Sequence, residues 1–346
     1  MKTIPSAVLT DPALTVRALT RADLAAVVAT DAAIEGQSRK AYVERRLAAA
    51  IRDPKLHAQF AACRGDEVVG YLLARVLLGE FGRERPALRL EMVGVSPTVR
   101  GLGAGHQLCE ALASWARRHG VAELRTAARW NDTAMVHWLD TTGFALAPGL
   151  ILGSSVDDRE PEPETEEEIV VIPGQGPGRE IDFGMPQAND HERHAMGQAE
   201  VRAMVTPDLR EIARIDRSIT GRDRTEYIAS RLGEAMDDAS IRVSLAARQD
   251  GAIVGYLMAR ADLGDFGRTA AVAVIDTIGV DPAYARRGVG RALLRQLFAN
   301  LGALCVESVE TVVPFDDLVM LGFFQASGFT PTQRLPFVRL LGDKPK

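Results

Sequence analysis

One stretch of sequence decides the fold, because an apolar strand pattern gives way there, through three glycines, to an amphipathic helix pattern. It reads Val95-Ser96-Pro97-Thr98-Val99-Arg100-Gly101-Leu102-Gly103-Ala104-Gly105. Glycines let the backbone bend and approach a ligand where a Cβ would obstruct it. The helix that follows offers free N–H groups and the positive end of its dipole, which together favour a pyrophosphate. The stretch therefore predicts a turn that holds a phosphate-bearing ligand.

Two better-known glycine turns do not fit this stretch. A Rossmann turn needs Gly-x-Gly-x-x-Gly closing the first strand of its domain, with an acid about 20 residues later for a ribose. Here several strands and two helices are expected before the turn, and the glycine spacing differs. A P-loop is also excluded, because the Gly-Lys-Ser/Thr signature is absent.

The turn occurs twice, at a constant offset of 185 residues. The second copy, residues 280–290, reads Val-Asp-Pro-Ala-Tyr-Ala-Arg-Arg-Gly-Val-Gly. The same offset carries Val69-Gly70-Tyr71-Leu72 onto Val254-Gly255-Tyr256-Leu257 without a gap. Such a register predicts a duplicated domain. We expect an N-terminal domain at residues 10–153, an acidic Pro/Gly-rich linker at 154–198 and a C-terminal domain at 199–346.

Composition narrows the class of protein. The 346 residues carry a net charge of −5, of which residues 157–168 alone contribute −7, leaving about +2 for the remainder. This acidic block predicts a solvated linker, with a docking tail for a basic partner as the alternative. The overall acidity argues against nucleic-acid binding, and no apolar run is long enough to span a membrane. Three widely spaced cysteines predict a protein of the reducing cytoplasm rather than a disulfide scaffold.

One copy of the repeat predicts a mixed α/β sheet with helices packed against it. Period-two patterns and turn residues predict the strands, and apolar residues at helical spacing predict the helices. The expected strands are 14–18, 60–63, 68–77, 88–95, 124–128 and 144–152, and the expected helices are 23–33, 40–51, 101–119 and 133–142.

These residues resemble the GNAT superfamily of acetyl-CoA-dependent N-acetyltransferases. The first turn matches the family's phosphate motif, Gln/Arg-x-x-Gly-x-Gly/Ala, as Arg100-Gly101-Leu102-Gly103-Ala104-Gly105. In the second copy Ala285 stands at the Gln/Arg position. The family's later segment, Asn-x-x-Ala leading to Gly-Phe, is present in the first copy from Asn131 to Gly143-Phe144, with one residue more than the usual spacing.

The resemblance implies two GNAT-type domains and a cofactor path in each. The strand before each turn would separate from its neighbour and admit the pantetheine arm, while the turn would hold the pyrophosphate. In the first copy the implied cofactor residues are Val93, Val95, Arg100, Gly101, Leu102, Gly103, Ala104, Gly105, His106 and Asn131. In the second copy they are Ile278, Val280, Arg286, Arg287, Gly288, Val289, Gly290 and Arg291.

The candidate catalytic residues are acids, because an amine must lose a proton before it attacks a thioester. Glu91 and its repeat mate Asp276 lie four residues before the end of the pre-turn strand, and an acid on the solvent face is the alternative reading. Glu80 and Asp265, in a repeated loop, are second candidates. The family's frequent general acid, a Tyr four residues before Gly-Phe, is replaced by Leu139 and Phe324.

We therefore expect an acyltransferase that moves an acetyl group from acetyl-CoA to the amine of a small molecule or protein, with at least one active site and no metal. Two alternatives stay open, namely a non-catalytic acetyl-CoA-binding sensor or scaffold, and a chain with one catalytic and one structural copy. The two copies would pack as an internal pseudo-dimer, in a monomer or a homodimer. The acceptor would bind around the loop between the first two helices of each copy. The residues expected there are Asp31, Ile34, Gly36, Arg39, Tyr42 and Arg46, with Asp216, Ile219, Gly221, Arg224, Tyr227 and Arg231 in the second copy.

Overall fold

The computed structural model describes residues 13–80, 85–156, 199–237, 242–263 and 271–342. Most of the expected linker, including the whole acidic block 157–168, lies outside these ranges. The described residues up to Gly153, those within Asp262–Ala271 and those from Thr311 onward form one compact unit. The described residues of Ser154–Ala261 and Val272–Glu310 form the core of a second.

The first sheet has seven strands in the order β1-β2-β3-β4-β5-β14-β6. Its strands from the N-terminal half are antiparallel except for the β4–β5 pair, which is parallel, so the predicted mixed α/β sheet is confirmed. The strands are β1 (Leu14–Ala18), β2 (His57–Arg64), β3 (Glu67–Leu77), β4 (Ala87–Val95), β5 (Glu123–Arg129), β6 (Ala145–Leu146) and β14 (Arg334–Leu340). The helices of this half are α1 (Leu24–Glu35), α2 (Lys40–Arg52), α3 (Ala104–Arg118) and α4 (Thr133–Thr141).

The second sheet also has seven strands, in the order β13-β7-β12-β11-β10-β9-β8. They are β7 (Gly149–Ser155), β8 (Glu200–Ala203), β9 (Arg242–Gln249), β10 (Ala252–Leu263), β11 (Ala271–Val280), β12 (Ser308–Pro314) and β13 (Thr330–Pro331). The helices of the C-terminal half are α6 (Leu209–Thr220), α7 (Thr225–Asp237), α8 (Val289–Ala303) and α9 (Leu318–Ala326). The expected elements of one copy thus recur in the other.

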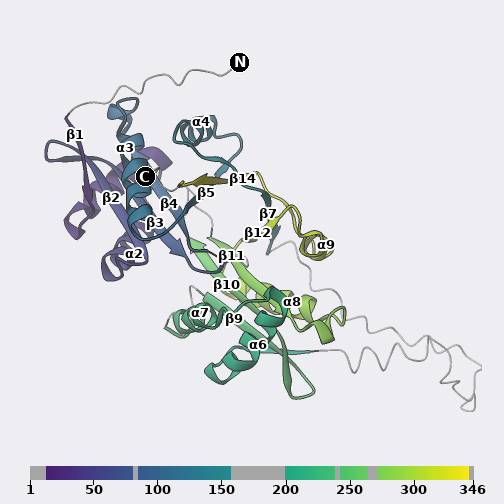
Figure 1. The fold of residues 1–346 in the computed structure, drawn as a ribbon. Helices are drawn as coiled ribbons and strands as arrows, with labels where there is room; N and C mark the ends of the chain where they lie inside the picture. The colour runs from purple at the N-terminus through teal and green to yellow at the C-terminus, as the bar shows by residue number, and fades with distance from the viewer. Residues whose placement is uncertain (1–12, 81–84, 157–198, 238–241, 264–270, 343–346) are drawn as a thin grey trace, which may run out of the picture. The chain divides into compact units, whose positions relative to one another are not determined.

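The last strand of each half joins the sheet of the other half. β14, from the C-terminal half, pairs antiparallel with β5 over seven residues and with β6 on its other side. Figure 1 shows β14 next to β5. β7 takes the corresponding place in the second sheet, beside β13. The prediction of one strand at residues 144–152 is wrong, because Pro148 lacks a donor and separates β6 from β7.

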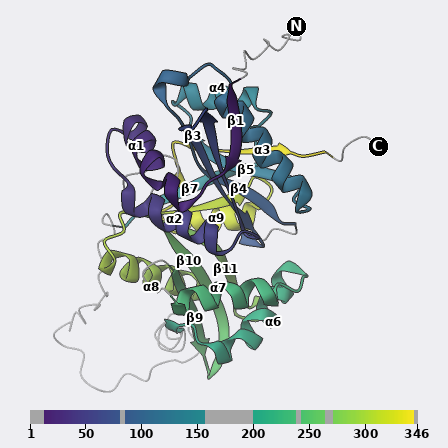
Figure 2. The same ribbon diagram turned by 90° about the vertical axis from the view of Figure 1, so that its left-hand side faces the viewer.

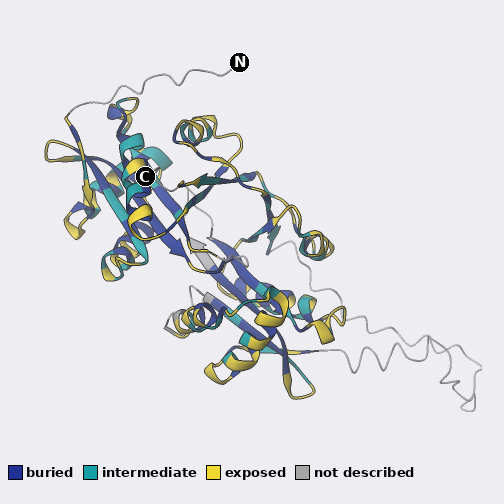
Figure 3. Cartoon of the chain, in the orientation of Figure 1, coloured by how far each residue is buried: buried dark blue, intermediate teal, exposed yellow. Residues whose placement is uncertain are grey.

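Helices cover both faces of the first sheet (Figure 2). Each face has its own apolar core. On one face α3 packs with Leu108 and Leu112 against alternate strand residues such as Leu72 and Leu90. On the other face α1 and α2 pack against the residues between them, including Tyr71. The buried residues form continuous bands along the central strands and the inner sides of the helices (Figure 3). No helix in the described ranges is long and apolar enough to cross a membrane.

Candidate active site

Strands β4 and β5 separate before they end. Within these two fully described strands the parallel pairs are Leu88 with Leu124 and Arg89 with Arg125, while β4 continues to Val95. Beyond the last pair, where the two strands diverge, the side-chain hydroxyl of Thr126 donates a hydrogen bond to the backbone carbonyl of Leu90 at 3.2 Å. The strands β11 and β12 likewise pair only from Val272–Ser308 to Val274–Glu310. Each half therefore has a pair of diverging strands next to its glycine turn.

The first glycine turn has a left-handed backbone at two positions. Gly101 and Gly103 have φ of 81° and 88°, a region that favours glycine. Gly103 is the N-cap of α3, whose first bond runs from the N–H of Gln107 to the carbonyl of Gly103 at 3.0 Å. The N–H groups of residues 103–106 thus precede the first intrahelical bond and are available to an anion. The phosphate-binding geometry expected of this turn is present.

The second turn repeats this backbone with a different residue. Gly288 is the N-cap of α8 with φ 81°, but Arg286 stands where the first half has Gly101, at φ 63°. A left-handed conformation costs a non-glycine residue about 1–2 kcal/mol. Asp281 accepts from the backbone N–H of Ala283, which lowers the pKa of its carboxyl, and pairs with Arg214 at 2.9 Å. The second turn therefore holds a paired carboxylate where the first has Ser96.

Around both turns the expected basic and amide side chains are exposed. Arg100 and Asn131 are exposed in the first half, and Arg286, Arg287 and Arg291 are exposed in the second. The guanidinium of Arg287 lies over the ring of Tyr284, 5.1 Å from its centroid. The backbone positions Val93, Val95, Ile278 and Val280 lie at the ends of β4 and β11, half-buried.

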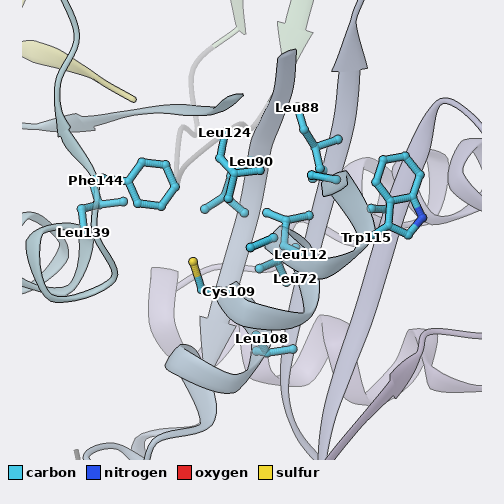
Figure 4. Packing of buried hydrophobic residues seen from close by; sticks show 14 of the residues in the cluster. Leu72, Leu88, Leu90, Leu108, Cys109, Leu112, Trp115, Leu124, Leu139 and Phe144 are labelled. Atoms are coloured by element: carbon cyan, nitrogen blue, oxygen red, sulfur yellow. The ribbon is translucent and has the colours of Figure 1, made fainter. Parts of the chain in front are cut away.

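Trp138, on α4, lies against the start of α3. A Cβ at Gly105 would come within 2.8 Å of the indole Nε1 of Trp138, so glycine is required there. Leu139, the position counted back from Gly143-Phe144, is fully buried, and Figure 4 shows it beside Phe144 in the core. Leu139 is therefore not the equivalent of the family's tyrosine. The segment from Asn131 to Gly143 has one residue more than usual, so counting forward from Asn131 with the usual spacing reaches Trp138 instead. The same count in the second half reaches Phe323, next to the buried Phe324.

Glu91 is buried on the face of the sheet covered by α1 and α2. Leu73 pairs with Met92 and Ala74 with Leu90, so Glu91 is the extra residue of a β-bulge in β4. Its Oε1 lies 3.0 Å from Arg46 and 3.2 Å from Arg75, and its side chain is 2% exposed. The alternative of an acid on the solvent face is therefore wrong for Glu91.

The other three candidate acids have different surroundings. Asp276 is also buried, and Arg260 donates to it from 3.1 Å, whereas the corresponding contact of Arg75 Nε with Glu91 Oε1 is an ion pair without a hydrogen bond. Glu80 is buried, with its Oε2 3.1 Å from the N–H of Gly79. Asp265 lies outside the described residues.

Most of the expected acceptor residues form a row of ion pairs, hydrogen bonds and cation–π contacts, which we call the charged ladder. In the first half it consists of Asp31, Arg39, Tyr42, Arg46 and Tyr71. Asp31 accepts from the guanidinium of Arg39 at 2.5 Å and from the hydroxyl of Tyr71 at 2.6 Å. Burial beside Asp31 raises the pKa of Tyr71 far above its usual range, so this phenol stays protonated. The guanidinium groups of Arg39 and Arg46 lie 5.8 and 5.4 Å from the centroid of the Tyr42 ring.

The C-terminal half repeats the ladder residue by residue. Asp216 accepts from Arg224 at 2.9 Å and from Tyr256 at 2.5 Å, and Tyr227 lies between Arg224 and Arg231. Ion pairing and packing thus account for why these residues are repeated. Each ladder ties the helices that flank the expected acceptor loop to the neighbour of the pre-turn strand, β3 in the first half and β10 in the second. Among the described residues no group of three or more His, Cys, Asp or Glu side chains could hold a metal ion.

Comparisons with known proteins agree with this arrangement. The model of the acetyltransferase (GNAT) family matches residues 26–144 and 206–329. The chain is 29% identical to mycothiol acetyltransferase of Beutenbergia cavernae over 252 residues, which is 68% of this chain and 72% of that protein. It is 40% identical over 88 residues to N-alpha-acetyltransferase RimI of Mycobacterium tuberculosis, which is 25% of this chain and half of RimI.

Two solved structures show the same fold at low sequence identity. A tandem GNAT protein from the clavulanic acid biosynthesis pathway superposes with a TM-score of 0.61 at 18% identity, covering 96% of this chain and all of that one. A GCN5-related N-acetyltransferase from Sphaerobacter thermophilus superposes with a TM-score of 0.58 at 17% identity, covering 96% and 98%. Each of the two segments that match the family contains one glycine turn and one pair of diverging strands.

Proposed function

Because the chain belongs to the acetyltransferase (GNAT) family, as its glycine turns predicted, we propose that its N-terminal half transfers an acetyl group from acetyl-CoA directly to an amine. The family makes the chain an acetyl-CoA-dependent N-acetyltransferase. The choice of half rests on one observation, the turn at Gly101–Gly103, which reaches its left-handed backbone with glycines alone. The C-terminal turn needs Arg286 for the same conformation.

Acetyl-CoA would lie between the separated ends of β4 and β5. Backbone groups of Val93 and Val95 would pair with the pantetheine arm, and the N–H groups of residues 103–106 would hold the diphosphate, since the N–H of Leu102 donates to the carbonyl of Val99. Arg100 and Asn131, exposed beside the turn, would add contacts to the same cofactor. In the second half the corresponding groups are Ile278, Val280, Arg286, Arg287, Gly288, Val289, Gly290 and Arg291.

We propose that Glu91 is the general base that deprotonates the amine. An amine of pKa about 10.4 is charged at pH 7, and its neutral form costs about 4.6 kcal/mol, or 3.4 pH units at 1.36 kcal/mol each. Glu91, at the bulge two residues before Val93, would accept that proton directly or through a water. The amine nitrogen then forms a bond to the acetyl carbon while a backbone N–H near Val93 stabilises the oxyanion. The C–S bond breaks, and the departing thiolate takes its proton from water.

Two relatives suggest which amines to test. Mycothiol acetyltransferase, related over most of the chain, is named for a small molecule, whereas RimI is named for protein α-amines. The match to RimI spans only half of that protein, so we favour a small-molecule amine as the acceptor. A panel that contains both small amines and peptide N-termini, assayed for CoA thiol release, tests the choice. Acetylation of peptide N-termini alone would contradict it.

Glu91→Gln tests the base. We expect kcat/KM to fall by about 10²- to 10⁴-fold and the acidic limb of the pH profile to disappear. Glu91→Asp should recover part of the rate. Asp66→Asn, which changes an exposed carboxylate in the β2–β3 turn to an amide, is the matched control and should leave the rate unchanged. A pH profile of the same shape in Glu91→Gln would show that Glu91 is not the base. Asp276→Asn measures the contribution of the second half, and we expect a smaller loss.

The alternative, an acetyl-CoA-binding sensor, is favoured by one observation. Glu91 and Asp276 are both buried against arginines, an arrangement that also suits two purely structural ion pairs. Calorimetry with acetyl-CoA, followed by the amine panel, separates the two functions. Tight binding without turnover of any amine would favour the sensor.

A further inference from the structure

The indole of Trp138 has an unused hydrogen-bond donor at the N-terminus of α3. Its Nε1 is buried and has no hydrogen-bond partner among the described residues, although an indole N–H can only donate. Burying such a donor without an acceptor is unfavourable, because the N–H loses its bond to water. The position of Nε1 against Gly105 directs attention to what binds at this end of the helix.

A second buried donor or acceptor lies in the same first turn of α3. Nε2 of His106 is likewise buried and without a hydrogen-bond partner in the described part of the chain. The N–H groups of residues 103–106, which precede the first intrahelical bond, belong to the same turn. In the described part of the chain, the indole N–H of Trp138, the Nε2 of His106 and the first backbone N–H groups of α3 therefore all belong to, or contact, one helix N-terminus and have no hydrogen-bond partner within the helix.

The C-terminal half lacks both side-chain groups. The offset of 185 residues places Phe323 at the position of Trp138 and Arg291 at that of His106. Phenylalanine has no donor, and Arg291 is exposed rather than buried. The paired carboxylate of Asp281 adds negative charge near the second turn. The two halves thus differ in the hydrogen-bond donors and in the charge that they present to an anionic ligand at the glycine turn.

We propose that the indole N–H of Trp138 donates a hydrogen bond to the diphosphate of CoA, and that the N-terminal half is therefore the tighter of two unequal CoA sites. The inference rests on the proposed function, since it requires acetyl-CoA at the first glycine turn. Trp138 is a binding residue and not the general acid, because an indole does not give up its N–H proton at neutral pH. His106 belongs to the first turn of α3, which Trp138 contacts from α4 at Gly105.

Calorimetric titration of the full chain with CoA and with ADP, which share the diphosphate, tests this inference. We expect Trp138→Phe, which copies the aromatic residue of the second half, to weaken the tighter site for both ligands by about 10- to 100-fold, typical of a hydrogen bond to a charged group. Unchanged affinity for both ligands would overturn the inference. Weakening for CoA alone would also overturn it, because the donor would then serve the pantetheine arm.

Gly105→Ala provides a second variant that keeps the indole. The new Cβ would meet Nε1 at 2.8 Å and displace the ring, so binding should weaken as it does in Trp138→Phe. The double variant should lose little more than either single variant. Full additivity would contradict a shared contact.

Tryptophan fluorescence supplies a readout that does not depend on activity. Bound CoA should change the emission of the wild-type chain and of Trp130→Phe, which removes an exposed indole, but not of Trp138→Phe. A wild-type chain that binds no CoA would refute the proposed function and this inference together. CoA binding that Trp138→Phe leaves intact would refute the inference alone.

Discussion

The two glycine turns have the same backbone and different side chains. Gly101 and Arg286 occupy equivalent left-handed positions, at φ 81° and 63°, and each is followed two residues later by a left-handed glycine N-cap. Arginine is a poor residue for this conformation, so the surrounding structure must impose it in the second half. The comparison shows that the packing of the domain specifies the turn, while its residues set what the turn can bind.

The largest expected effect tests whether the first sheet depends on β14, a strand from the C-terminal half, for its stability. Phe337 lies on β14 but is buried in the core of the first sheet, so Phe337→Ala should lower the free energy of unfolding by about 3–5 kcal/mol. Hydrogen exchange should show the loss in α3, which packs on that core, more than in α8. Leu340→Ala, on the same strand but 71% exposed, is the control and should change little. Greater loss of protection in α8 would contradict the strand order.

The next effect tests the charged ladders, which are alike in both halves. Tyr71→Phe and Tyr256→Phe each remove a donor from a buried carboxylate, so each should cost about 1.5–3 kcal/mol in urea unfolding. The two losses should agree, because the contacts have nearly the same length. Tyr284→Phe, at a half-buried ring stacked with Arg287, should cost less than about 0.5 kcal/mol. Losses that differ by more than about 1 kcal/mol would show that the ladders are not equivalent.

A smaller effect addresses the turns themselves. Arg286→Gly removes the penalty of a left-handed arginine but adds backbone entropy to the unfolded chain, so we expect a net gain of about 0.5–1 kcal/mol. The reciprocal Gly101→Arg should lose about as much. Thermal melting of both variants provides the measurement. A loss in both would mean that Arg286 makes a stabilising contact that outweighs its conformation.

The smallest effect concerns an ion pair between a partly exposed arginine and a buried aspartate, which is present in both halves. The hydrogen bond from Arg17 lowers the pKa of Asp23 well below its usual range, and the backbone N–H and hydroxyl of Thr20 also donate to Asp23. A lowered folded-state pKa stabilises the protein above the ordinary aspartate pKa, and the gain is lost as pH falls below it.

Asp23→Asn should therefore destabilise the protein at pH 7 by less than about 1 kcal/mol and change little near pH 2. Asp208→Asn, in the second half, should cost less, because Val205 offers a backbone donor but no hydroxyl. Urea unfolding at the two pH values measures both. An equal cost at both pH values would contradict the ion-pair explanation.

Local patterns predicted the elements of each half well. The strand at Leu14–Ala18 and the start of the helix at Lys40 are confirmed, because alternation and helical spacing are properties of short segments. The helix predicted to start at Gly101 begins at Ala104 instead, since left-handed backbone at Gly101 and Gly103 cannot continue into a helix.

Local patterns did not predict which sheet the last strands join. The two halves carry the same alternation, so β14 fits beside β5 as well as β7 would, and nothing within either segment distinguishes the two partners. The break at Pro148 was the available signal, because it separates a short strand that stays in the first sheet from one that leaves it.

The site was predicted in part. The turn geometry followed from its glycines, and the repeat pointed to Glu91, but the arginines that bind Glu91 come from α2 and β3, far along the chain. Trp138 was missed because the count ran backward from Gly143-Phe144 across an extra residue. A count from Asn131 would have found it.

The place of β14 has a consequence for how the protein is made. A ribosome releases the N-terminal half early, yet the first sheet is completed by residues 334–340, which are synthesised after all the other strands of that sheet. Until then, the edge of β5 that pairs with β14 exposes unpaired backbone groups, a site for unintended pairing with another chain. The nascent first half therefore depends on a strand far downstream in the chain, and a chain terminated before residue 334 would present an open sheet edge to the cell's chaperones.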